Sequence, residues 1–406
     1  MLKWILPGIL LLWSGQLSGL AAQTSPAVSP SETAQIQAQI AQLEQLLPHT
    51  TDRGAALFLM AKQYTQLGET SKAFPLLKEC ISLDEGFDPS DSQLLKPLRS
   101  FPEFPQLVDD VHRRHPAVHR ARVALTVSET DLFPEGFAVD PERHVFYMGS
   151  MHRKKIVLID QKGGVSDFVK PGLYNLLGLG GIKVDPADHS LWAASDEHEA
   201  SELLHFDGHG KLLQRYSPPE AGPHVLNDLV LHGPQDIYVT DTAAQRVYRF
   251  DRVAHSFTPM TLTRPLFYPN GIALSADENQ LYIADLMGVI QIDLRRNAAA
   301  DIDPGPHNTL AGNDGLYWYK GSLLGVQYGT GTFRVMRWQL SPDGLRVAAT
   351  QVLEYRTPLV KDPTTGAIDG GKFYYIANTG IDNLQDDKIV DPKKLEPVHI
   401  AVVGLE

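Results

Sequence analysis

Four residues with oxygen-bearing side chains occupy comparable places along the chain, each just before an apolar, strand-like run. They are Glu135, Asn227, Asn270 and Asp314. Two carboxylates and two carboxamides around one point would suit a hard divalent cation, Ca²⁺ before Mg²⁺, with water completing the shell. Neither cysteine nor histidine, the ligands of softer metals, stands at these positions. The pattern therefore predicts a hard-cation site, provided that the fold brings the four residues together.

An ordinary turn is the alternative explanation for part of this set. Asn270 and Asp314 both precede a glycine, and Asn or Asp before Gly is a common turn former. Glu135 and Asn227 fit that explanation less well, because Glu is not a favoured turn residue and Asn227 precedes Asp. The shared place of all four in a repeating unit favours the site.

The repeat is clearest in two stretches, residues 227–241 and 270–285. Each opens with an asparagine, runs through an apolar strand and a polar turn, and ends in a Tyr-containing strand closed by Asp. Six such second strands can be aligned, with starts about 42 to 50 residues apart, the spacing of propeller blades. They are Val145–Met148, Leu191–Ala194, Ile237–Thr240, Leu281–Ala284, Leu323–Val326 and Phe373–Ile376.

Further strand-like runs follow the second strands, so that four strands fit each blade. Examples are Lys155–Ile159, Leu203–Phe206, Arg246–Phe250, Val289–Ile292 and Val335–Leu340. The runs Val123–Val127 and Val398–Gly404 could share one blade and close the ring, which would remove an open sheet edge. We therefore predict a mainly β chain in which residues 121–406 form a six-bladed β-propeller.

In a propeller the first strand of each blade lines the central channel, so equivalent positions converge on the axis. The positions before the six first strands hold Glu135, Gly180, Asn227, Asn270, Asp314 and, less clearly, Thr365. Four of the six carry oxygen donors, which places the predicted cation site on the axis.

Residues 36–116 have a helical pattern instead. Ile36, Ile40, Leu43, Leu46 and Leu47 mark one helix face, and Pro48 ends that helix. Residues 53–84 resemble one tetratricopeptide repeat, whose packing positions would hold Leu57, Met60, Ala61, Tyr64, Gly68, Ala73, Leu77 and Cys80. A single repeat cannot bury both faces, so it should pack on a neighbour. A helical cap or protein-docking module is expected, and a peptide-binding role is the alternative.

The N-terminus resembles a secretory signal peptide over residues 1–22. Lys3 precedes a short apolar run, Trp4–Trp13, and small residues follow at 19–22. The run is short for a membrane span, so we expect a secreted or periplasmic protein with no membrane contact after cleavage. Residues 23–35, rich in Pro, Ser and Ala, are predicted to be a linker.

Composition excludes two further possibilities. The formal net charge of −12 argues against nucleic acid as a partner. Cys80 is the only cysteine, so no internal disulfide can form, and we expect it to be a small buried residue of the helical hairpin.

The axial set resembles the family of senescence marker protein (regucalcin), gluconolactonase and luciferin-regenerating enzyme. It is also similar to paraoxonase and diisopropyl fluorophosphatase, which share the six-bladed propeller and an axial calcium. The resemblance covers about residues 121–406 and implies that Glu135, Asn227, Asn270 and Asp314 are the metal ligands of a lactone or phosphoester hydrolase. By the same analogy Asp314 is the candidate base. Asp228 resembles a paraoxonase residue that serves a second calcium, and a supporting role behind the ligands is equally open.

Departures from the family narrow the expected substrate. Sugar lactonases of the regucalcin type have an arginine where this chain has Val225, which points away from charged sugar acids and toward a less polar small molecule, a lactone or an ester. His224 and Tyr328 are expected to shape the pocket mouth, whereas His152 and His198 fit surface loops better than a catalytic pair. A propeller that uses its metal only for stability and binds partners without catalysis is the alternative function.

Overall fold

A computed structural model of the chain describes residues 29–197, 200–262 and 264–406. The predicted signal peptide and the first part of the predicted linker lie outside the described residues. Within those ranges, no helix is both long and apolar enough to cross a membrane.

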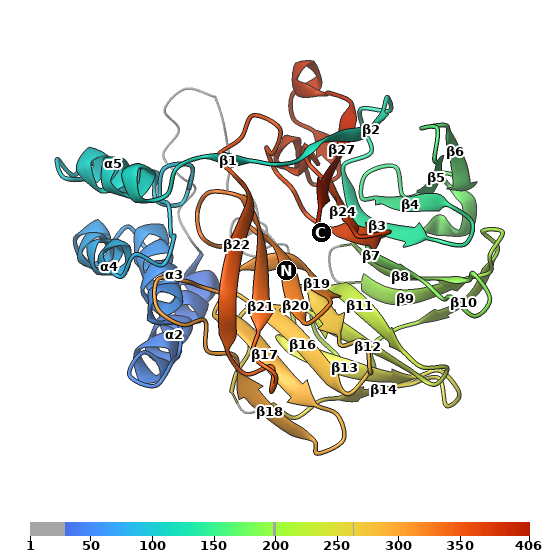
Figure 1. Ribbon diagram of the computed structural model, residues 1–406, viewed down its shortest axis with the longest axis horizontal. Helices are drawn as coiled ribbons and strands as arrows, with labels where there is room; N and C mark the ends of the chain where they lie inside the picture. Colours follow the sequence, from blue (N-terminus) through green and yellow to red (C-terminus); the bar gives the residue numbers. More distant parts are fainter. Residues whose placement is uncertain (1–28, 198–199, 263) are drawn as a thin grey trace.

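Six sheets surround one axis, as the repeat predicted (Figure 1). The first three blades each contain four antiparallel strands in chain order from the axis outward. They are β3 (Pro134–Asp140), β4 (Val145–Ser150), β5 (Ile156–Asp160) and β6 (Val165–Val169); β7 (Gly178–Val184), β8 (Leu191–Glu197), β9 (Ala200–Phe206) and β10 (Leu212–Tyr216); β11 (Leu226–His232), β12 (Asp236–Asp241), β13 (Arg246–Asp251) and β14 (Ser256–Pro259).

Blades four and five continue this order, and the short strand β1 (Val118–His119) extends the outer edge of blade five. Their strands are β15 (Ile272–Leu274), β16 (Gln280–Asp285), β17 (Gly288–Asp293) and β18 (Ala298–Asp301); β19 (Asn313–Tyr319), β20 (Ser322–Gln327), β21 (Arg334–Leu340) and β22 (Val347–Tyr355). All six predicted second strands are confirmed, as β4, β8, β12, β16, β20 and β24.

Blade six closes the ring with strands from both ends of the propeller. Its order from the axis is β23 (Gly366–Asp369), β24 (Lys372–Ile376), β27 (Val398–Gly404) and β2 (Arg122–Val127). β2 pairs antiparallel with β27, with Val123 opposite Ala401. The predicted closure is confirmed, and it covers the edge that β27 would otherwise expose. The connection from β24 to β27 carries a small hairpin, β25 (Leu384–Gln385) and β26 (Lys388–Ile389), and two 3₁₀ turns, Ile381–Asn383 and Pro392–Lys394.

Within the part of the chain that the structure describes, four α-helices precede the propeller, and they lie to one side of the ring rather than in its channel (Figure 1). They are α2 (Pro30–Leu46), α3 (Arg53–Gln66), α4 (Thr70–Ser82) and α5 (Phe104–Arg114), with a 3₁₀ turn at Lys96–Ser100. A helical hairpin over residues 53–84 is thus present, and its likeness to a tetratricopeptide repeat stays a prediction. Cys80 is fully buried in this hairpin, as expected.

The predicted linker is too long at its C-terminal end. α2 begins at Pro30 and not near Ile36. Ser29 caps it: the Ser29 hydroxyl accepts from the Glu32 backbone, and the Glu32 carboxylate accepts from the Ser29 backbone. This capping box, with proline in the first turn, satisfies the free amides of the helix start, so residues 30–35 are helical.

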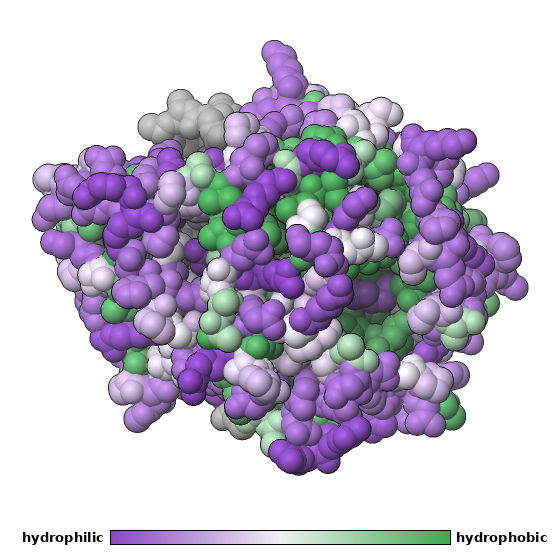
Figure 2. Space-filling view, in the orientation of Figure 1, coloured by the Kyte–Doolittle hydropathy of each residue, from purple (hydrophilic) through white to green (hydrophobic). Residues whose placement is uncertain are grey.

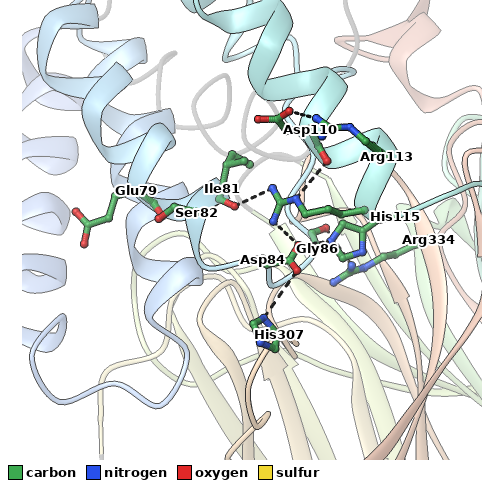
Figure 3. Close-up of polar contacts among 11 residues, drawn as sticks. Glu79, Ile81, Ser82, Asp84, Gly86, Asp110, Arg113, His115, His307 and Arg334 are labelled. Atoms are coloured by element: carbon green, nitrogen blue, oxygen red, sulfur yellow. Dashed lines mark hydrogen bonds and ion pairs between the residues drawn. The ribbon is translucent and has the colours of Figure 1, made fainter.

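The helical region is tied to itself and to the propeller by a polar cluster at Asp84 (Figure 3). Asp84 has a φ of 60° and accepts from Arg114 and from Nε2 of His115, at the end of α5. Nη2 of Arg114 also donates to the carbonyl of Ile81, at 3.1 Å. His307, from a propeller loop, lies 3.8 Å from Asp84. These contacts join α4, α5 and blade five's entry loop.

The propeller and the helical region differ in the polarity of their surfaces. Figure 2 shows apolar side chains gathered around the middle of the face in view, over the propeller, whereas the helical region and the rim are mostly hydrophilic.

Candidate metal centre at the propeller axis

Short contacts near the first-strand positions join neighbouring blades around the axis. Thr240 Oγ1 donates to the carbonyl of Asn270 at 2.7 Å, which joins blades three and four. Gly315 N donates to the carbonyl of Thr364 at 3.3 Å, joining blades five and six. Thr365 Oγ1 then donates to the carbonyl of Glu135 and closes the ring between blades six and one. The predicted convergence of these positions on one axis is therefore what the structure has.

The bulges of the inner strands were not predicted. Glu135, Asn227 and Asp314 stand at the second residue of β3, β11 and β19 and not before them. In each case the strand register shifts directly at that residue, between Pro134 and Phe137 in β3 for example. A β-bulge turns a side chain away from the alternating pattern of its strand. Here it lets three ligand candidates face the axis while their strands continue into the blades.

Glycine next to the bulge allows the inner strands to approach. A Cβ atom at Gly136 would lie 1.9 Å from the carbonyl oxygen of Gly180, and one at Gly271 would lie 2.3 Å from that of Asp314. Any side chain at these positions would collide with the neighbouring backbone. The glycine that follows Glu135 and Asn270 is thus needed for packing at the axis, not only for a turn.

All four candidate ligands are buried, with 2–6% of each residue exposed. Asn227 Nδ2 donates to Thr242 Oγ1 at 3.0 Å, which orients the amide and leaves Oδ1 as the atom for a cation. Among the described residues, neither amide atom of Asn270 makes a hydrogen bond of ordinary geometry, and Oδ1 of Asp314 makes none, although the Asn270 amide lies near enough to Asp314 to lower the pKa of that carboxyl. Buried polar atoms are normally satisfied, so unpaired oxygens at the axis indicate a missing partner.

Both carboxylates have raised pKa values, and Asp314 contributes to the rise at Glu135. Burial raises the pKa of Glu135 well above its usual range, and the charges of Asp314 and then Asp196 raise it further. Burial also raises the pKa of Asp314 to about 7, with Asn270 opposing and Asp228 adding to the rise. Burial and neighbouring negative charge disfavour the ionised form of both carboxyl groups. A cation bound between them would stabilise that ionised form.

The residues present therefore fit a hard divalent cation. The donors are all oxygen, two of them carry charge, and unpaired oxygens face the axis. The described residues contain no cluster of three or more His, Cys, Asp or Glu side chains with metal-binding geometry. The axial set is of a different kind, since only two of its four members are acidic. Glu135, Asn227, Asn270 and Asp314 would hold the ion.

Asp228 has a partner inside the protein. Its Oδ1 accepts from Lys183 Nζ at 2.7 Å and from the backbone of Leu229 at 2.8 Å. The Lys183 ammonium supplies positive charge at Oδ1, whereas Oδ2 of Asp228 is buried without a hydrogen-bond partner among the described residues, so a supporting role and a second cation both stay predictions. Sequence reasoning missed Lys183, because nothing in its local context marks it out.

His224 is held within its own blade. Nδ1 lies 2.6 Å from Oδ2 of Asp241, and Nε2 lies 2.9 Å from the carbonyl of Glu220. The imidazole is buried, and both nitrogens face acceptors. Its observed contacts fix a loop next to Asn227 and give no contact with the cavity at Asp314. The expected place at the pocket mouth stays a prediction.

Tyr328 does lie at the cavity beside Asp314. This cavity leaves about 20 Å³ in which the centre of a water-sized sphere can move. It is large enough for a water molecule or an ion. Its lining is Asp314, Tyr328, Phe333, Asp362, Pro363, Thr364, Ile381 and Asp382.

Two carboxylates in this lining, Asp362 and Asp382, were not predicted. Burial raises the pKa of Asp362 to about 6, although hydrogen bonds from Thr379 and Gly380 oppose the rise. Burial and the charge of Asp362 raise the pKa of Asp382 to about 7. Both belong to irregular segments of blade six, where the repeat is weakest, so alignment of the blades could not find them.

Comparisons with known proteins agree with this fold. No protein-family model matches the chain, and no curated protein does. Among solved structures, regucalcin of Agrobacterium tumefaciens, described as a calcium-binding protein, is 18% identical over 71% of this chain and 97% of its own, with a TM-score of 0.50. A gluconolactonase of Xanthomonas campestris is 17% identical over 72% and 98%, with a TM-score of 0.49.

A luciferin-regenerating enzyme is 16% identical over 69% of this chain and 95% of its own, with a TM-score of 0.48. At such identities the likeness shows the fold alone. The structural neighbours of this chain thus include the gluconolactonase, regucalcin and luciferin-regenerating propellers that its axial residues resemble, and the chain shares their six-bladed architecture.

Proposed function

We propose that the protein is a cation-dependent hydrolase of a lactone or an ester, with Ca²⁺, or otherwise Mg²⁺, held by Glu135, Asn227, Asn270 and Asp314. The observation that carries the proposal is a set of buried oxygen donors from four blades near the axis: the charge of Asp314 raises the pKa of Glu135, and Oδ1 of Asn270 and of Asp314 makes no hydrogen bond of ordinary geometry among the described residues. Gluconolactonase and calcium-binding regucalcin among the structural neighbours support the same choice.

The cation would polarise a carbonyl or phosphoryl oxygen and make nearby water more acidic. Asp314 is the proposed group that takes a proton from the attacking water. Its raised pKa, about 7, suits proton exchange near neutral pH. Asp362 and Asp382 line the same cavity and are not proposed ligands, so they are the other carboxylates able to exchange protons there.

Substrate selection follows from the residues around the site. Val225 offers no positive charge to a sugar acid, so a less polar, small substrate is proposed. Substrate would approach past the loops of blades five and six that line the cavity at Asp314, which include Tyr328 and Asp382.

A second function rests on that small cavity. A propeller whose cation serves only stability needs no substrate space, and its faces could bind a partner protein. We further propose that the chain is exported, because the N-terminal 22 residues have the pattern of a signal peptide. After cleavage, neither a membrane nor nucleic acid is proposed as a partner.

The decisive experiment is a panel of lactones, aryl esters and phosphotriesters, assayed with the protein as purified, after chelation, and after Ca²⁺ or Mg²⁺ is restored. Activity that is lost with chelator and regained with the cation supports the hydrolase. Cation binding without activity on any substrate would favour the binding propeller, and absence of cation binding would refute the axial site.

A further inference from the structure

Three polar side chains of the helical region reach into the loops that carry the candidate site. These loops precede the first strands of blades four and five and follow the second strand of blade five. Each contact lies within a few residues of Asn270, Asp314 or Tyr328, and each joins segments more than 200 residues apart in the sequence.

The first contact supports the Asn270 loop. Gln39 of α2 donates through Nε2 to the hydroxyl of Tyr268, at 2.8 Å. Gln63 of α3 donates to Oε1 of Gln39, also at 2.8 Å, so the carboxamide is held in one orientation. Tyr268 has a φ of 54°, a conformation that a bulky residue rarely adopts without support. It stands two residues before Asn270.

The second contact supports the loop that leads to Asp314. Asp52 caps α3 with Oδ1, which accepts from the backbone of Ala55 at 3.0 Å. Its Oδ2 accepts from the hydroxyl of Thr309 and from the backbone of Leu310. One carboxylate therefore fixes both the start of α3 and the entry to β19. Asp52 is 2% exposed, so these bonds are protected from water.

The third contact supports the loop of Tyr328. Lys62 of α3 donates through Nζ to the carbonyl of Gly329, at 3.1 Å, and lies over the ring of Phe58. Only 8% of Lys62 is exposed, although lysine is rarely buried. A buried ammonium is costly unless it is hydrogen-bonded, so the Gly329 carbonyl is an important partner.

Apolar packing surrounds these bonds. One buried cluster combines residues of the helical region with residues of the blade-four loops, and Tyr328 packs against it. Its members are Leu43, Ala56, Leu59, Met60, Phe267, Tyr268, Leu286 and Met287. α3 is buried over almost its whole length, as expected for a helix enclosed between α4 and the propeller.

We infer that the helical region is a positioning element of the axial site, in which Gln39, Asp52 and Lys62 hold the loops of Asn270, Asp314 and Tyr328 in the arrangement that accepts a cation. This rests on the proposed cation function. The region is thus a built-in part of the binding site rather than an independent docking module. Because linkage is reciprocal, a bound cation also strengthens the docking of the helices.

The test uses the full-length mature chain and two probes, Ca²⁺ by calorimetry and Tb³⁺ by tyrosine-sensitised luminescence. Gln39→Leu removes the bond to Tyr268, and Gln42→Leu, at an exposed position of the same helix, is its matched control. Lys62→Met removes the bond to Gly329, and Lys62→Arg keeps a donor there. Changes in residues that orient metal ligands typically cost about 10- to 100-fold in affinity.

We expect Gln39→Leu and Lys62→Met to weaken Ca²⁺ binding about tenfold or more, whereas Gln42→Leu stays like the wild type and Lys62→Arg restores most of the affinity. The Tb³⁺ luminescence lifetime in Gln39→Leu should shorten by the amount that about one additional bound water causes, because solvent replaces a misplaced Asn270 oxygen. A general loss of stability would not change hydration of the bound ion.

The outcomes separate this inference from the proposed function. If the wild type binds the cation and Gln39→Leu and Lys62→Met match it in affinity and lifetime, the positioning role is wrong and the axial site stands. If the wild type binds neither Ca²⁺ nor Tb³⁺, both proposals are wrong. If Lys62→Met does not fold, the comparison of Gln39→Leu with Gln42→Leu decides alone.

Discussion

Asp314, in the first strand of blade five, raises the pKa of Glu135, in the first strand of blade one. The two acidic groups therefore lie near each other in the buried centre of the propeller, although they are far apart in the sequence. Burial alone disfavours each negative charge, and their mutual repulsion adds to this. The arrangement costs folding free energy unless a cation or protons neutralise it, which is the basis of the predictions that follow.

Removal of either carboxylate should abolish most of the cation affinity. Glu135→Ala and Asp314→Ala each delete one of the two charged ligands, whereas Asn227→Ala deletes a neutral oxygen and should weaken binding less. Metal content by elemental analysis, with calorimetric titration of Ca²⁺, provides the measurement. Full occupancy in both carboxylate variants would show that the ion binds elsewhere.

Cation affinity should increase as the pH rises. The pKa of Asp314 is raised to about 7 and that of Glu135 is raised well above its usual range, so at lower pH the cation has to displace protons. We expect affinity to rise about tenfold per pH unit for each proton released. Titrations in buffers of different ionisation enthalpy count those protons, and a flat profile between about pH 5.5 and 8.5 would contradict the prediction.

The cation-free protein should also lose stability as the pH rises. A carboxyl whose folded-state pKa is raised binds more protons folded than unfolded, between its ordinary pKa of 3.8 and its folded value of about 7. The free energy of unfolding then falls as the pH rises through this window. Chemical denaturation with chelator should show the fall, and added Ca²⁺ should reduce it by stabilising the ionised form.

Asp314→Asn should reduce turnover much more than substrate binding. The variant keeps an oxygen for the cation but cannot accept a proton, and loss of a general base costs on the order of 10²–10⁴-fold in rate. Asp382→Asn is the matched comparison, because it changes a carboxyl on the same cavity that is not a proposed ligand. If the metal-loaded Asp382 variant loses the rate and the Asp314 variant keeps it, the base is Asp382.

Gly136→Ala should destabilise the propeller and weaken cation binding together. A Cβ there would lie 1.9 Å from the carbonyl oxygen of Gly180, which is backbone and cannot rotate away. Forced overpacking costs about 1–3 kcal/mol, occasionally more. Gly404→Ala, in the outer part of blade six with open space around its Cβ, is the control. Equal unfolding midpoints would show that the inner strands can move apart at no cost.

The sequence by itself was enough to predict the propeller and the residues around its axis. The repeat of apolar second strands recurs at blade spacing because every blade must bury both faces against its neighbours. Equivalent residues then converge on one axis by symmetry. For this reason Glu135, Asn227, Asn270 and Asp314 could be placed together before any coordinates, and closure by residues 123–127 and 398–404 followed from the need to cover an edge.

The remaining features depended on tertiary contacts. The bulges at Glu135, Asn227 and Asp314 arise where inner strands crowd at the axis, and no local pattern marks them. The contact between the Lys183 ammonium and the Asp228 carboxylate is made by the side chains of two different blades, so it depends on how the blades pack. Local sequence patterns predict how one segment folds. They do not predict which distant loop a helix will contact, and the contacts that Asp52 and Lys62 make with propeller loops exist only because the tertiary structure packs α3 against those loops.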